Sequence, residues 1–191
     1  MINSNDIENI FKEQLAKIDD DTLKGNVIKT WIKACTQGNW NSIEELKNIP
    51  FTLLVETAGI NFIEHTIAVT EGAACLARSH MDYYNTLPYQ IDFDRIYVGG
   101  LLHDVGKLVE IEPDEKGGYQ KSLSGKYARH PISGAILAAE CGIPESIVNI
   151  IACHSKEGDG RPQVIETIFI HQADFACFNP LVMKANGLLI E

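Results

Sequence analysis

The sequence has no long apolar run: no stretch approaches the roughly 20 consecutive apolar residues that a membrane-spanning helix needs. Its first residues, 1–6, lack the basic segment and the apolar block of a secretory signal peptide. The five cysteines are an odd number, are widely spaced and include no Cys-x-x-Cys pair, which argues against a disulfide framework. We therefore expect a cytoplasmic protein without a membrane partner, whose cysteines are reduced residues of the core.

Positive charge is scarce, with 16 Lys and Arg against 26 Asp and Glu and a formal net charge of −10. Proteins that coat nucleic acid do so through clustered Lys and Arg, so a nucleic-acid partner is not expected. One segment departs from this balance: residues 116–131 contain no acidic residue and carry Lys116, Lys121, Lys126 and Arg129. Such a basic island suits a small phosphate-bearing substrate.

Strand patterns are also missing, since no segment of length alternates between apolar and polar residues. Nearly every longer segment repeats its apolar residues at helical spacing instead. The expected helix starts are a capping box at Asn61 and Glu64, an aspartate at Asp92 or Asp94, and the prolines Pro131 and Pro144. A polar loop is expected at residues 112–125 and a last helix at 164–178. The sequence therefore predicts an all-α fold.

Two parts of the chain differ in the chemistry they carry. Residues 1–58 contain amphipathic helical segments, the first expected to be capped by Asn5 or Asp6, but no candidate ligand. We expect this N-terminal helical extension to pack on the core or to form a dimer surface, which leaves a homo-oligomer open. Residues 59–191 contain all the candidate ligands and are expected to form the catalytic domain.

The most informative motif is His103-Asp104, which an apolar run delivers in Leu101-Leu102-His103-Asp104-Val105-Gly106-Lys107. Four more potential ligands, each on or beside an apolar helical segment, accompany it: His65, His130, His154 and Asp174. A single buried histidine is usually a hydrogen-bonded core residue, and a single aspartate near a helix end is usually a cap. Six such groups on inward faces must satisfy each other, be neutral or hold a cation, because an unpaired buried charge is costly.

These six side chains have the composition of a transition-metal centre. The set His65, His103, Asp104 and Asp174 would complete one site, and His130 and His154 could build a second, with Asp104 as the bridge. Mixed imidazole and carboxylate ligands favour Mn, Fe, Co, Ni or Zn over Mg. Two such ions would generate a metal-activated hydroxide at neutral pH.

The ordered pattern His65, His103-Asp104 and Asp174 resembles that of the HD-domain metal-dependent phosphohydrolases over roughly residues 60–178. The resemblance implies a helical bundle, a metal held by those residues and hydrolysis of a phosphate ester. His130, followed by His154 and Asp159-Gly160, looks like the binuclear branch, which includes the HD-GYP cyclic-dinucleotide phosphodiesterases. The chain departs from HD-GYP because Ser155 replaces a second consecutive histidine and residues 160–162 lack the tyrosine of the motif.

The implied function is hydrolysis of a phosphomonoester or phosphodiester of a small, nucleotide-like substrate. Asp104 would bridge the ions, and Lys107, which the resemblance includes, would act in catalysis by binding a phosphoryl oxygen. Lys126 and Arg129 are weaker candidates for binding the rest of the substrate. Two alternatives stay open: a di-iron oxygenase, because some HD-type proteins use a nearly identical six-ligand site, and a regulatory HD module with an inactive site.

Overall fold

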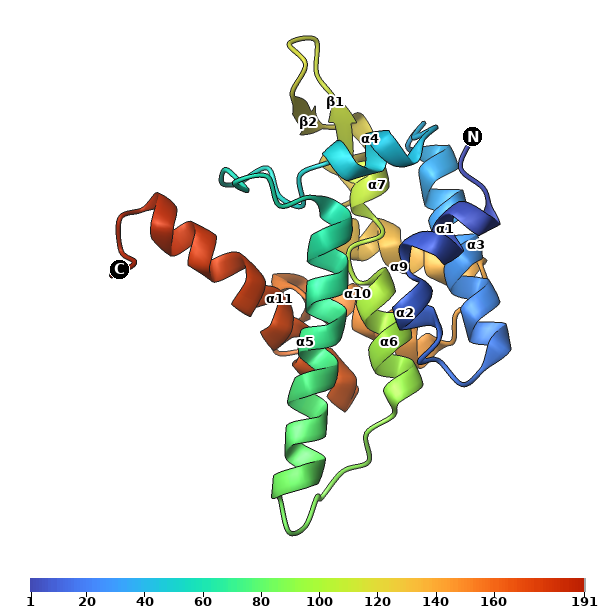
Figure 1. The fold of residues 1–191 in the computed structure, drawn as a ribbon, viewed down its shortest axis with the longest axis vertical. Coiled ribbons are helices and arrows are strands. Elements are labelled where there is room, and N and C mark those ends of the chain that lie inside the picture. The colour runs from blue at the N-terminus through green and yellow to red at the C-terminus, as the bar shows by residue number, and fades with distance from the viewer. Residues whose placement is uncertain (191) are drawn as a thin grey trace.

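The computed structural model describes residues 1–190 and is a helical bundle (Figure 1). The segment expected to form the catalytic domain, residues 59–191, is therefore described except for its last residue, Glu191. The helices are α1 (Ser4–Ile10), α2 (Lys12–Leu15), α3 (Asp21–Gln37), α4 (Ile43–Asn48), α5 (Phe62–Tyr83), α6 (Phe93–Leu102), α7 (Lys107–Glu110), α8 (Leu123–Tyr127), α9 (His130–Glu140), α10 (Glu145–Cys153), the 3-10 helix η1 (Lys156–Gly158) and α11 (Ile165–Ala185). The predicted all-α class is confirmed.

One short β-hairpin interrupts the helices. Strands β1 (Ile111–Pro113) and β2 (Tyr119–Lys121) pair antiparallel, with Ile111 opposite Lys121. The sequence predicted a loop over residues 112–125, and this prediction was wrong for the hairpin and for the start of α8. Strands of three residues are too short to show the alternation by which a strand is recognised.

Helix starts follow the local signals in most places. The Asn61 side chain accepts from the Glu64 N–H at 3.0 Å, and the Glu64 carboxylate accepts from the Asn61 N–H at 3.0 Å, as the capping box predicts. Helix α6 begins after Asp92, one of the two residues expected. Helix α1 instead begins after Asn3 rather than Asn5 or Asp6, because Asp6 completes a capping box with Asn3.

Helix α11 runs on to Ala185, beyond the predicted end at residue 178. Pro180 lies inside this exposed part of the helix, where water can satisfy a backbone group that proline leaves unpaired. In Figure 1 the second half of α11 projects from the body of the molecule as an arm. None of the described helices has both the length and the apolar character that a membrane crossing requires.

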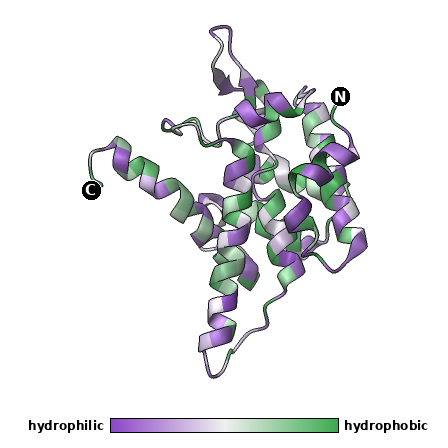
Figure 2. Ribbon diagram, in the orientation of Figure 1, coloured by the Kyte–Doolittle hydropathy of each residue, from purple (hydrophilic) through white to green (hydrophobic). Residues whose placement is uncertain are grey.

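Helices α5, α6 and α11 pack together and carry much of the core. Figure 2 shows apolar residues concentrated in the middle of the bundle and a largely hydrophilic hairpin. The approach of α5 and α6 depends on Gly100, because a Cβ there would lie 2.7 Å from Thr70 Oγ1 and 2.9 Å from Thr70 Cα. This close packing places the first turn of α5 beside the end of α6, where His103 lies.

The N-terminal segment packs on the turn around the His-Asp motif. The indole N–H of Trp31 donates to the carbonyl of Leu101 (3.0 Å), and that of Trp40 donates to the carbonyl of Leu108 (2.7 Å). Both indoles are buried.

The five cysteines form no disulfide, and Cys75 is exposed, so the expectation that all of them are core residues was wrong.

Candidate metal centre

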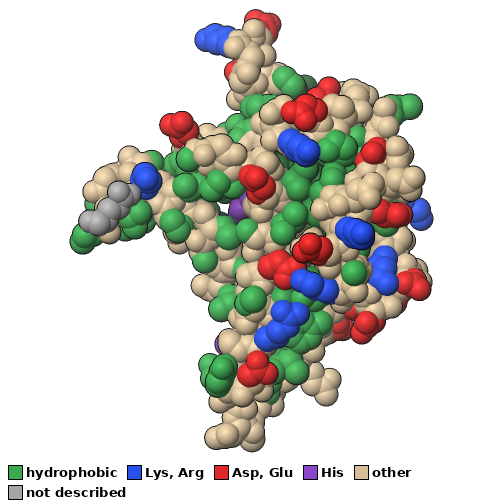
Figure 3. Space-filling model, viewed as in Figure 1, with side chains coloured by type: hydrophobic (Ala, Val, Ile, Leu, Met, Phe, Trp, Pro, Cys, Tyr) green, Lys and Arg blue, Asp and Glu red, His purple; other side chains and the backbone are tan. Residues whose placement is uncertain are grey.

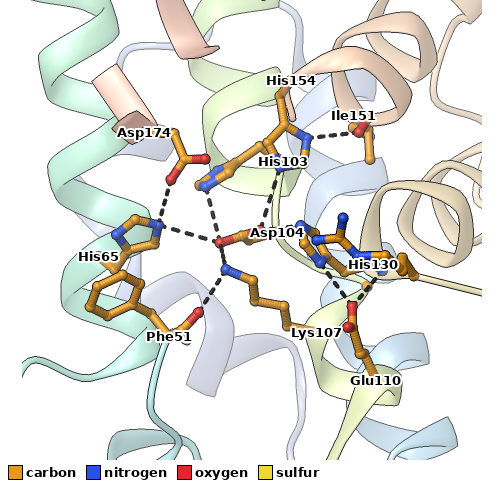
Figure 4. A network of polar contacts seen from close by, with 12 residues as sticks. Phe51, His65, His103, Asp104, Lys107, Glu110, His130, Ile151, His154 and Asp174 are labelled. Atoms are coloured by element: carbon orange, nitrogen blue, oxygen red, sulfur yellow. Dashed lines mark hydrogen bonds and ion pairs between the residues drawn. The ribbon is translucent and has the colours of Figure 1, made fainter. Parts of the chain in front are cut away.

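Six side chains from five segments converge at the centre of the bundle (Figure 4). They are His65 in the first turn of α5, His103 at the C-cap of α6, Asp104 in the following turn, His130 at the start of α9, His154 at the C-cap of α10 and Asp174 within α11. Their potential ligand atoms form two groups, each within 4.8 Å, and both groups contain Asp104. The structure thus brings together all six candidates.

Asp104 lies between two pairs of histidines. Its Oδ2 is 3.3 Å from Nε2 of both His65 and His103, and its Oδ1 is 3.2 Å from Nε2 of His130 and 3.5 Å from that of His154. Asp174 Oδ1 adds to the first pair, at 3.1 Å from His65 Nε2. The two oxygens of one carboxylate therefore face two separate groups of potential ligands.

Main-chain carbonyls orient two of the histidines. His103 Nδ1 lies 2.7 Å from the Gly100 carbonyl, and His154 Nδ1 lies 2.8 Å from that of Ile151. A carbonyl only accepts, so Nδ1 carries a proton in each ring, and Nε2 is the nitrogen that faces Asp104. Both carbonyls come from the residue three positions earlier, at the end of the same helix.

Several buried polar atoms of this cluster have no hydrogen-bond partner: Nε2 of His65, His103 and His154, and Oδ1 of Asp104. Buried polar atoms without a partner are rare and costly, and their donor set of imidazole nitrogen and carboxylate oxygen suits a divalent transition metal. The residues present therefore fit a metal centre.

The charges of the cluster also suit metal binding. Burial alone would raise the pKa of Asp104, but Lys107, His103 and His130 hold it well below its usual value. Burial opposes ionisation of Asp174 too, yet contact with His65 lowers its pKa to about 2. Burial lowers the pKa of His130 to about 4 despite the nearby Asp104 carboxylate. Ionised carboxylates and a neutral imidazole are the forms that bind metals.

His65 differs from His130 in the direction in which its pKa is shifted. Burial opposes its charged form, but contacts with the carboxylates of Asp104 and Asp174 outweigh burial and raise its pKa. The ring of Phe51 stacks on the His65 imidazole at a centroid distance of 4.1 Å and fixes its plane.

Lys107 lies one turn after Asp104 and points back to it. Its amine donates to Asp104 Oδ2 at 2.5 Å and to the Phe51 carbonyl at 2.6 Å. The second contact could not be read from the sequence, because Phe51 is 56 positions away from Lys107 and residues 51–55 carry no recognisable motif.

Glu110 is a site residue whose role the sequence did not reveal. Its Oε2 accepts from the main-chain N–H of His130 at 2.6 Å and lies 2.8 Å from His130 Nδ1, while Lys121 Nζ lies 3.0 Å from its Oε1. Burial would raise its pKa, but His130 and Lys121 lower it to about 2. The only sequence signal was its spacing of three residues from Lys107.

A cavity of about 360 Å³ contains Lys107, His130 and Asp174 in its lining. Figure 3 shows a histidine visible in a hollow beside the α11 arm. The cationic side chains of the lining are Lys107, Lys121, Arg129 and Lys156. Arg129 also pairs with Glu157 at 2.6 Å. Another cavity, of about 470 Å³ beside the hairpin, contains none of the six candidate ligands.

Lys126 and His171 lie apart from the cluster. Lys126 is exposed on α8 and does not line the cavity, so the geometry does not favour the role in substrate binding predicted for it. His171 in α11 is half-buried, and its Nδ1 lies 2.7 Å from the His154 carbonyl. It contacts the main chain of a candidate ligand rather than the cluster itself.

A helical bundle with this ordered set of histidines and aspartates is the arrangement that the sequence pattern predicted for an HD-type metal site. Comparison with known families supports this assignment. The model of the HD domain family matches residues 62–175, more than half of the chain. The chain therefore belongs to the HD domain family. No solved structure gives a significant match.

Among curated proteins, the chain is similar to several bacterial proteins named Ribonuclease Y. It is 29% identical to that of Pseudothermotoga lettingae over 116 residues, which cover 61% of this chain and 18% of the relative. Identity to that of Thermotoga petrophila is 31% with the same coverage. Identity to that of Borreliella afzelii is 39% over 74 residues, which cover 39% of this chain and 12% of the relative. The chain thus spans less than a fifth of these relatives.

Proposed function

We propose that this chain is a metal-dependent phosphohydrolase that cleaves a phosphomonoester or phosphodiester of a small, nucleotide-like substrate. The observation that supports this best is Asp104, whose two carboxylate oxygens face two separate groups of potential ligands. The cavity beside it is lined by four cationic side chains, which suit an anionic substrate.

In this proposal, His65, His103, Asp104 and Asp174 hold one divalent ion, and Asp104, His130 and His154 hold a second. The expected metals are Mn, Fe, Co, Ni or Zn, as the mixed donor set indicates. When bound, such ions act as Lewis acids, lower the pKa of a coordinated water and stabilise charge on phosphoryl oxygens.

The remaining side chains position the substrate. Lys107 places a cation next to Asp104 and lines the cavity, so its amine can bind a phosphoryl oxygen and stabilise the charge that develops there. Arg129 lies at the same cavity and offers a planar group of donors for a second phosphate oxygen. Its contact with Glu157 holds it near the cavity without burying it.

RNA is a second candidate substrate because the relatives carry the name Ribonuclease Y. These relatives do not support the expectation, drawn from the net charge, that the chain has no nucleic-acid partner. A phosphodiester of RNA would use the same centre and the same cationic lining. The cytoplasmic location and the homo-oligomer stay predictions.

The test begins with metal-free protein loaded separately with Mn, Fe, Co, Ni and Zn, with the bound ions counted by elemental analysis. Each form is assayed on bis-p-nitrophenyl phosphate, p-nitrophenyl phosphate, nucleotides and a short single-stranded RNA. We expect two ions and hydrolysis in wild type, and loss of metal and activity in Asp104→Ala. Asp82→Ala, at an exposed position near the end of α5, is the matched control.

Other outcomes would favour the alternatives. Oxygen consumption by the iron form without hydrolysis would favour a di-iron oxygenase. Inactivity with every metal and substrate would favour a regulatory HD module. Full activity of Asp104→Ala would contradict its assignment as the bridging ligand.

A further inference from the structure

The cavity at the candidate metal centre has a second, apolar wall. It consists of Leu53 and Leu54, from the segment between α4 and α5, and of Phe175 and Phe178, from α11. Leu53 is 41% exposed and Leu54 is 79% exposed. Apolar side chains grouped at the mouth of a cavity are typical of a ligand-binding site, because a ligand removes them from water.

Both pairs of wall residues lie near a residue with a role in the proposed function. These residues are Asp174, a proposed metal ligand, and Lys107, proposed to bind phosphate. Phe175 follows Asp174 directly, and Phe178 lies three residues further along the same helix, on nearly the same face. Leu53 and Leu54 closely follow Phe51, whose carbonyl accepts from Lys107 (Figure 4). A ligand with its phosphate at Lys107 therefore places the group attached to that phosphate against this wall.

Most of the wall lies outside the part of the chain that matches the family. Leu53, Leu54 and Phe178 lie outside the residues 62–175 that match the HD domain, and Phe175 is the last matched residue. The family resemblance therefore says nothing about what this surface binds. Its chemistry must be judged from the side chains themselves.

We infer that this wall, defined as Leu53, Leu54, Phe175 and Phe178, is a binding subsite for a planar aromatic group joined to the substrate phosphate. The inference rests on the proposed function and names the substrate class more closely. Phenylalanine rings stack on flat aromatic groups, and leucine side chains add apolar contact area. A cavity of about 360 Å³ is near the lower end of the range for small-molecule sites, so it holds one such group.

The inference is tested by calorimetric titration of the Mn²⁺-loaded protein with phenylphosphonate and with methylphosphonate. The two probes carry the same anionic head and differ only in the planar group. We expect phenylphosphonate to bind wild type about tenfold more tightly than methylphosphonate, by the gain from aromatic stacking. In Phe178→Ala and Leu54→Ala this preference should fall severalfold, while the affinity for methylphosphonate stays unchanged.

Ile168→Ala is the matched control, because Ile168 is an exposed apolar residue of the same helix that does not line the cavity. Leu54→Ala keeps the test valid if Phe178→Ala fails to fold, since Leu54 is largely exposed. Equal affinity of wild type for both probes, no measurable binding of phenylphosphonate, or equal weakening of both probes in both variants would overturn the inference. Because no turnover is measured, a preference for phenylphosphonate in a protein without hydrolase activity would refute the proposed function and not the subsite.

Discussion

Glu110 is expected to set the affinity of the proposed centre for its second ion, the one assigned to Asp104, His130 and His154, because it orients His130. Its Oε2 receives the main-chain N–H of His130 at 2.6 Å and lies 2.8 Å from Nδ1 of the same residue. Glu110 is only 6% exposed, so water cannot readily replace these contacts. Partners of this kind typically contribute about 10- to 100-fold to the metal affinity of the histidine they orient.

Two substitutions of Glu110 distinguish the effect of its negative charge from the effect of its contacts with His130. Glu110→Gln keeps an oxygen that can accept from His130 but loses the negative charge, so we expect the second ion to bind about tenfold more weakly. Glu110→Ala also leaves the His130 N–H buried without its acceptor, so we expect about a hundredfold weaker binding and a loss of about 1–3 kcal/mol in the free energy of unfolding. The first ion, assigned to His65, His103, Asp104 and Asp174, should bind as in wild type.

The assay is calorimetric titration of metal-free protein with Zn²⁺ or Mn²⁺, with urea denaturation in parallel to measure stability. Glu112→Gln is the matched control, because Glu112 lies two residues further along and accepts from the exposed amide of Gln120 at 3.1 Å. Equal weakening of both ions, or unchanged binding in Glu110→Ala, would refute the assigned role of Glu110.

Three further outcomes are expected. Gly100→Ala should lose about 1–3 kcal/mol of stability in urea denaturation through overpacking against Thr70, whereas Gly25→Ala, where an added Cβ meets no atom within 4 Å, should be neutral or stabilising; equal effects would contradict the packing argument. Lys107→Met should keep both ions by elemental analysis but hydrolyse phosphate esters about 10²- to 10³-fold more slowly, while Lys126→Met should match wild type; loss of an ion from Lys107→Met would mean that its amine supports the centre instead. Chelation should lower the unfolding temperature of metal-loaded protein, because an ion that binds only the folded state stabilises it by about 2.7 kcal/mol at 100 times its dissociation constant; an unchanged temperature would argue against a bound ion.

Helix starts were readable from the sequence because the contacts that make them are local. Asn61 and Glu64 are three residues apart and complete their capping box without help from the rest of the fold. The arm of α11 beyond residue 178 was missed because Pro180 lies inside it, and a proline in the interior of a helix usually ends or kinks the helix. The hairpin was missed because strands of three residues carry too little pattern.

The sequence by itself determined which side chains could serve a metal: an ordered set of histidines and aspartates on apolar helical segments, with His103-Asp104 at its middle. The tertiary structure decided how they meet. It alone placed one oxygen of Asp104 toward His65 and the other toward His130, and it alone brought the Phe51 carbonyl to Lys107. These contacts join residues far apart in the chain, and they form only because whole helices pack at specific distances, which no local pattern of residues encodes.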